Sequence, residues 1–77
     1  MTLWQAGNIV RAYGKANRYW YQHQRDYRAA NVADKLQRRC YEVITEVAET
    51  SSSDAERLHD LFLREHWSTT FLVPLSS

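Results

Sequence analysis

Residues that interrupt helices and strands, or that cross-link a chain, are scarce in this sequence. Its 77 residues include one cysteine, one proline and two glycines, and neither glycine nor proline occurs between Lys15 and Val73. A single cysteine excludes a disulfide within the chain, and the lack of breakers leaves nothing that requires a strand-and-turn architecture. No apolar run approaches the roughly 18 residues that cross a bilayer.

The N-terminal residues 1–14 also lack the charged start and long apolar segment of a secretion signal. Hydrophobic residues make up 44% and charged residues 25% of the chain, which is typical of a globular protein and not of a disordered one. We therefore expect one cytoplasmic domain with no membrane contact. A domain this short buries only about 60% of the surface of its unfolded chain, so we also expect it to associate, as a two-fold homodimer.

Charge is divided unequally along the chain, although the net charge is only +1. Residues 1–40 hold eight Lys/Arg and two Asp, a net charge of +6, whereas residues 41–77 hold two Arg and seven Asp/Glu, a net charge of −5. The two halves can neutralise each other, within one chain or between two chains, or the basic half can bind an acidic partner. We favour neutralisation.

The spacing of apolar residues predicts a first helix over residues 3–24. Thr2 and Gln5 have the spacing of a capping box, which satisfies backbone N–H groups at the start of a helix. Gly7 and Gly14 are seven residues apart and therefore share one face. We expect a second helix to approach closely at that face.

Two further helices are predicted after the first. A wide apolar stripe over residues 29–47 covers about half of a helix circumference, and Ser53 is placed to cap a shorter third helix over residues 54–66. Residues 68–77 combine β-branched residues with a proline, which favours an extended tail. The sequence thus predicts an all-α fold: a small three-helix bundle over residues 1–67, with a long antiparallel first pair, followed by the tail.

The boundary between the first two helices stays open at this point. Asp26 or Asn31 could cap a new helix, or the two segments could form one long bent helix. The apolar spacing slips between Tyr27 and Ala29, which favours a bend or short turn near residues 25–30. Four large side chains are expected in the core, namely Trp20, Leu36, Val43 and Phe62.

Candidate catalytic and metal-binding groups are incomplete. Glu56 precedes His59 in a Glu-x-x-His spacing, and His66 lies on the same helix face. Metal sites in helical bundles need two such motifs and further carboxylates from facing helices. Cys40 lies on the apolar stripe, where burial raises the pKa of a thiol and weakens it as a nucleophile. We expect no enzyme activity, no metal and no cofactor.

A basic stripe on the first helix, flanked by aromatic residues, is the clearest candidate surface. We predict a protein–protein interaction module, an adaptor, inhibitor or regulatory subunit, that binds its partner through Trp4, Arg11, Lys15, Arg18, Tyr21, Arg25, Trp67 and Phe71. Nucleic-acid binding is the alternative, with the basic side chains on phosphates and the aromatic rings on bases. The nearly neutral net charge disfavours that alternative.

Overall fold

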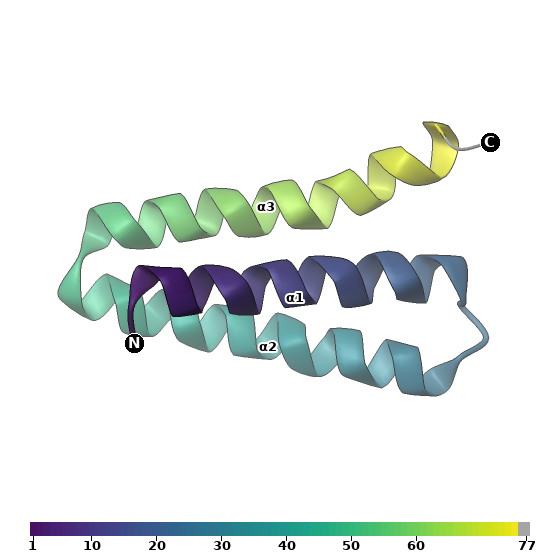
Figure 1. The fold of residues 1–77 in the computed structure, drawn as a ribbon, viewed down its shortest axis with the longest axis horizontal. Helices are drawn as coiled ribbons and strands as arrows, with labels where there is room; N and C mark the ends of the chain where they lie inside the picture. The colour runs from purple at the N-terminus through teal and green to yellow at the C-terminus, as the bar shows by residue number, and fades with distance from the viewer. Residues whose placement is uncertain (76–77) are drawn as a thin grey trace.

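A computed structural model describes the backbone of residues 1–75 and the side chains of residues 1–67. Within this part, the chain forms three helices and no strand: α1 (Leu3–Gln22), α2 (Tyr27–Thr50) and α3 (Ser52–Leu75). α2 runs antiparallel to α1, and α3 runs in the same direction as α1 (Figure 1). The all-α fold class and the three-helix bundle with an antiparallel first pair are confirmed.

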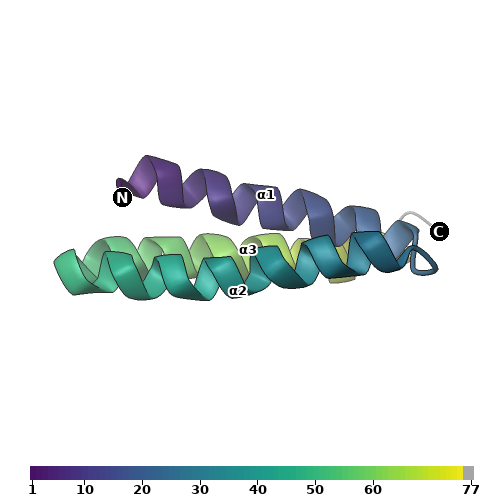
Figure 2. The ribbon, with the colours of Figure 1, turned by 90° about the horizontal axis from the view of Figure 1, so that it is seen from below.

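The three helices pack as a triangle. Every pair of helices is in contact. In Figure 1 α1 lies between α3 and α2, and in Figure 2 it lies to one side of both over most of its length. Each helix therefore has one face toward the other two helices and an outer face toward solvent.

Polar caps mark where α1 and α2 begin. At the start of α1, the Gln5 N–H donates to Thr2 Oγ1 at 3.2 Å and the Thr2 N–H donates to Gln5 Oε1 at 3.0 Å, which confirms the capping box. α1 ends at Gln22, and α2 begins after Asp26, whose carboxylate accepts from the N–H groups two and three residues further on. The first two segments are thus two helices joined by a short link, not one bent helix.

α3 begins two residues earlier than predicted. Its cap is Ser51 instead of Ser53, because the Ser51 hydroxyl accepts a hydrogen bond from the Asp54 N–H at 3.3 Å. Three successive serines all have the side chain that favours an N-cap, so residue type alone could not select among them. α2 ends at Thr50 and α3 begins at Ser52, so Ser51 is the one residue between them and occupies the cap position.

α3 also continues further than predicted. The backbone of residues 68–75 is helical and ends at Leu75, where the sequence favours an extended segment, so α3 has the same 24 residues as α2. β-branched residues lower helix propensity by only tenths of a kcal/mol each, and lengthening an existing helix needs no new nucleus. Residues 76–77 lie outside the described residues.

The core is narrow and contains few large side chains. The largest buried side chains come from all three helices: Val10, Tyr13, Cys40, Val43, Leu58 and Phe62. Burial of Val43 and Phe62 is confirmed. Leu36 is half-buried and packs against the edge of the core, and Trp20 is also half-buried. Trp20 lies in the last turns of α1, where the bundle ends, so neighbouring helices cover only part of its ring.

The predicted close approach at the two glycines is confirmed, and α3 is the approaching helix. A Cβ placed at Gly14 would lie 3.1 Å from the Cβ of Glu65 and even closer to its carboxyl group. A Cβ at Gly7 would meet its nearest atoms, from Arg11 and Leu61, at 3.9 Å. A methyl group at position 14 would therefore force Glu65 to move, whereas position 7 has room for a methyl group.

Substituting each glycine by alanine should have opposite effects on stability. Gly7→Ala is expected to raise the free energy of unfolding by up to about 1 kcal/mol, because alanine is the better helix former. Gly14→Ala is expected to lower it, because Glu65 must move away from the new methyl group. Urea unfolding of the two variants measures both effects. Equal stabilisation by both substitutions would show that α3 does not approach Gly14 this closely.

Candidate interaction surface

The structure places the residues of the predicted basic stripe in different surroundings. Arg18 faces α3, and its Nη1 donates to Glu65 Oε2 at 2.9 Å. Both side chains are partly covered, so this pair joins α1 to α3 within one chain. It supplies part of the neutralisation expected between the basic and acidic halves. Lys15 is exposed on another side of α1, in a groove shared with α2.

Trp4 and Arg11 lie in a groove between α1 and α3, which we call the α1–α3 groove. It has a volume of about 500 Å³ and is lined by Leu3, Trp4, Gly7, Arg11, Arg57, Leu58 and Leu61. Trp4 is 74% exposed and stands at the edge of this groove. An apolar hollow therefore lies beside two arginines and a tryptophan.

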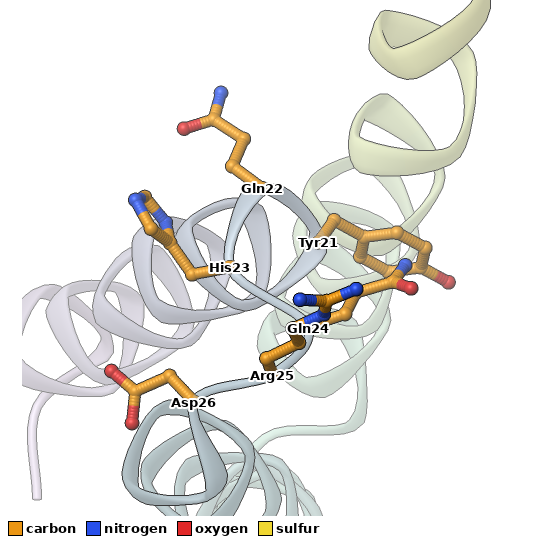
Figure 3. A pocket seen from close by; sticks show the side chains of 6 residues that line it. All are labelled: Tyr21, Gln22, His23, Gln24, Arg25 and Asp26. Carbon is orange, nitrogen blue, oxygen red and sulfur yellow. The ribbon is translucent and has the colours of Figure 1, made fainter.

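Tyr21 and Arg25 lie at the other end of α1, around the link to α2. The hollow there is lined by residues 21–26 and has a volume of about 610 Å³. Figure 3 shows Tyr21 and Arg25 on one side of the link, while His23 points away on the other side. These side chains do not converge on a common point, so we assign no binding site to this hollow.

The aromatic residues predicted on the third helix are only partly described. Trp67 is 51% exposed, and its ring meets the ring of His66 edge-on with centroids 5.2 Å apart. The Phe71 side chain lies outside the described side chains. Trp4 is in the first turn of α1 and Trp67 is far along α3, so the two tryptophans mark different parts of the bundle.

A buried hydrogen bond between α1 and α3 was not predicted from the sequence. The Tyr13 hydroxyl lies 2.7 Å from His66 Nδ1, and the Tyr13 ring stacks on Phe62 with centroids 5.2 Å apart. A tyrosine on the apolar side of a helix indicates such a partner, because a buried hydroxyl needs a hydrogen bond. The sequence does not identify which helix supplies it. His66 therefore has a structural role in the bundle.

Among the described side chains, the amide nitrogen of Asn17 is buried without a hydrogen-bond partner. Asn17 is only 6% exposed, and its Nδ2 makes no hydrogen bond in the structure. Its neighbours around a small hollow of about 230 Å³ include Tyr13, Trp20 and Ala33. A buried N–H group without a partner costs about 1–3 kcal/mol.

Groups that could support catalysis are not gathered in a site. Burial raises the pKa of the Cys40 thiol from 9.0 to about 11, which leaves little thiolate near neutral pH. His59 and Glu56 are exposed on α3. Among the described residues, no three His, Cys, Asp or Glu side chains form a group that could hold a metal ion.

Stability is expected to fall in alkaline solution. Burial, with smaller contributions from Tyr41, Cys40 and Tyr21, raises the pKa of Tyr13 from 10.0 to about 12, and burial raises that of Cys40 from 9.0 to about 11. The unfolded chain then loses these protons at lower pH than the folded chain. The contribution of these two groups to the free energy of unfolding should be constant below pH 9 and should decrease from there to about pH 12.

Urea unfolding across this pH range measures the decrease. The double variant Tyr13→Phe/Cys40→Ala lacks both groups, so its alkaline decrease should be smaller than that of the parent. Equal pH dependence of parent and variant would show that the two groups do not titrate differently on folding.

No family model, no curated protein and no solved structure matches this chain, so the candidate surface rests on the geometry of this chain alone. Over the described residues, no helix combines the length and the apolar character that crossing a membrane would require.

Proposed function

We propose that this chain is a protein–protein interaction module that carries out no catalysis. It acts as an adaptor, inhibitor or regulatory subunit and binds a larger protein through its helix faces. The exposure of two tryptophans, Trp4 and Trp67, is the observation that supports this function. Tryptophan is enriched among the few residues that dominate binding energy in protein interfaces, and covering an exposed apolar ring is favourable.

Partner capture from extracts of the native host tests this function. The double variant Trp4→Ala/Trp67→Ala should lose the captured protein, whereas Tyr27→Ala, which removes another exposed aromatic ring, should retain it. Circular dichroism of each variant checks that the helices are intact. Equal capture by the parent and the double variant would contradict a role for the tryptophans.

The same capture is repeated with nuclease treatment. A partner that remains after nuclease supports the interaction module. Material that disappears with nuclease, and whose binding weakens steeply with added salt, would instead support nucleic-acid binding through Arg11 and Lys15.

We also propose that the chain forms a two-fold homodimer in solution. Apolar side chains remain exposed on α2, among them Val32 and Tyr41, and the core of the single chain is small. Association through like surfaces would cover such side chains. Light scattering should then give twice the chain mass of 9.1 kDa. A mass of 9.1 kDa over a wide range of concentrations would exclude the dimer.

A further inference from the structure

The α1–α3 groove combines an apolar base with positive charge. Leu58 and Gly7 are buried at its base, and Leu3 and Leu61 are half-buried along it. Arg11 of α1 and Arg57 of α3 are both exposed and both line it. No acidic residue is among the lining residues. A ligand that fits this groove would be apolar with a negative charge.

The two arginines are not used by the ion pairs found in the fold. The ion pairs among the described residues are Arg18–Glu65, Arg38–Asp34 and Arg39–Glu42. The Arg11 guanidinium would lie 3.9 Å from a Cβ placed at Gly7, so it packs over the base of the groove. Arginine suits this role because its planar group can bind a carboxylate through two parallel hydrogen bonds.

We propose that the α1–α3 groove binds an acidic amphipathic helix of another protein. A large apolar side chain of that helix packs against Trp4 and Leu61, and a neighbouring carboxylate pairs with Arg11 and Arg57. Binding of an amphipathic helix in an apolar groove is a recurring mode of peptide recognition. The volume of about 500 Å³ suits a few side chains. This inference rests on the proposed interaction function.

A second copy of the chain fits the groove less well. The acidic segment of this chain is the C-terminal half of α2, where Glu42, Glu46 and Glu49 are exposed. Because the three helices pack as a triangle, the outer face of α2 lies opposite the α1–α3 groove (Figures 1 and 2). A contact between two different surfaces would pass from copy to copy into a ring or an open chain and would not close as a two-fold dimer.

Fluorescence anisotropy with two synthetic peptides tests the proposal. One peptide is an amphipathic helix with leucines on one face and glutamates on the other, and the second has lysines in place of the glutamates. The parent protein should bind the glutamate peptide at least about ten-fold more tightly than the lysine peptide. The variant Arg11→Glu/Arg57→Glu should reverse this preference. The control Arg28→Glu/Arg64→Glu makes the same change in net charge at exposed arginines outside the groove and should keep it.

Filling the groove provides a second test that does not change charge. Gly7→Leu places a large side chain at the base of the groove, where a Cβ would already contact Arg11 and Leu61, and replaces glycine by a better helix former. It should weaken binding of the glutamate peptide by at least about ten-fold, with the helical circular dichroism signal unchanged. Gly7→Ala, which adds only a methyl group, should weaken binding much less.

Three results would overturn the proposal. The first is equal binding of the two peptides, and the second is binding of the glutamate peptide that survives both Gly7→Leu and Arg11→Glu/Arg57→Glu. The third is growth of the protein into open oligomers that the same charge reversal abolishes, because the occupant would then be a second copy. A host partner that binds these groove variants as tightly as the parent would leave the proposed function intact and exclude the groove as its site.

Discussion

Replacing Phe62 by alanine is expected to remove most of the stability of the protein. Phe62 is 5% exposed, and its ring meets Tyr13 of α1 and Tyr41 of α2 at centroid distances of 5.2 and 5.4 Å. It therefore connects all three helices at one point. Truncation of a buried phenylalanine costs about 3–5 kcal/mol, whereas a small domain has only about 5–15 kcal/mol of stability in total.

Urea unfolding followed by circular dichroism measures this loss. Leu63→Ala is the matched control, because Leu63 is the next residue along α3 and its side chain is exposed. Its substitution should change the free energy of unfolding by only about 0.5 kcal/mol. A Phe62→Ala variant as stable as the Leu63→Ala control would show that Phe62 is not the centre of the core.

Replacing Asn17 by leucine is expected to stabilise the protein. The substitution removes a buried amide whose Nδ2 has no hydrogen-bond partner and puts an apolar side chain of similar size in its place. The free energy of unfolding should rise by about 1–3 kcal/mol, the cost of leaving a buried polar group unpaired. Leucine is also a somewhat better helix former than asparagine, so the two effects add.

The control for Asn17→Leu is Asn8→Leu, at an exposed position of the same helix. It carries the difference in helix propensity without the buried amide and should raise stability by only tenths of a kcal/mol. Urea midpoints of the two variants separate the contributions. Destabilisation by Asn17→Leu would show that the amide forms a favourable interaction in the folded protein.

Local sequence features predict the helices of this protein well where polar caps accompany the apolar spacing. Thr2 and Gln5 at the start of α1 satisfy N–H groups that a helix leaves unpaired, and Asp26 does the same at the start of α2. The end of α3 was not predictable in the same way. Apart from Pro74, residues 68–75 have weak local preferences, and such preferences are easily overridden once a helix is already formed.

The sequence predicted only some of the residues that line the α1–α3 groove. Trp4 and Arg11 were predicted to bind a partner, but Arg57 and Leu61 were not, because only the packing of α3 on α1 brings them to the same place. The paired glycines signalled the approach of a helix, yet the spacing could not say which one. Likewise, the charge pattern predicted neutralisation between halves but could not assign Arg18 to Glu65.

Photo-crosslinking from position 4 in the native host tests protein binding most directly. A photoreactive phenylalanine derivative replaces Trp4, whose side chain is exposed at the edge of the α1–α3 groove. The same derivative at Tyr27, exposed at the start of α2, is the control. An interaction module that uses this groove should give discrete adducts with another protein from position 4 and none from position 27. Adducts with nucleic acid alone, or no adduct from position 4 while the helices remain folded, would contradict it.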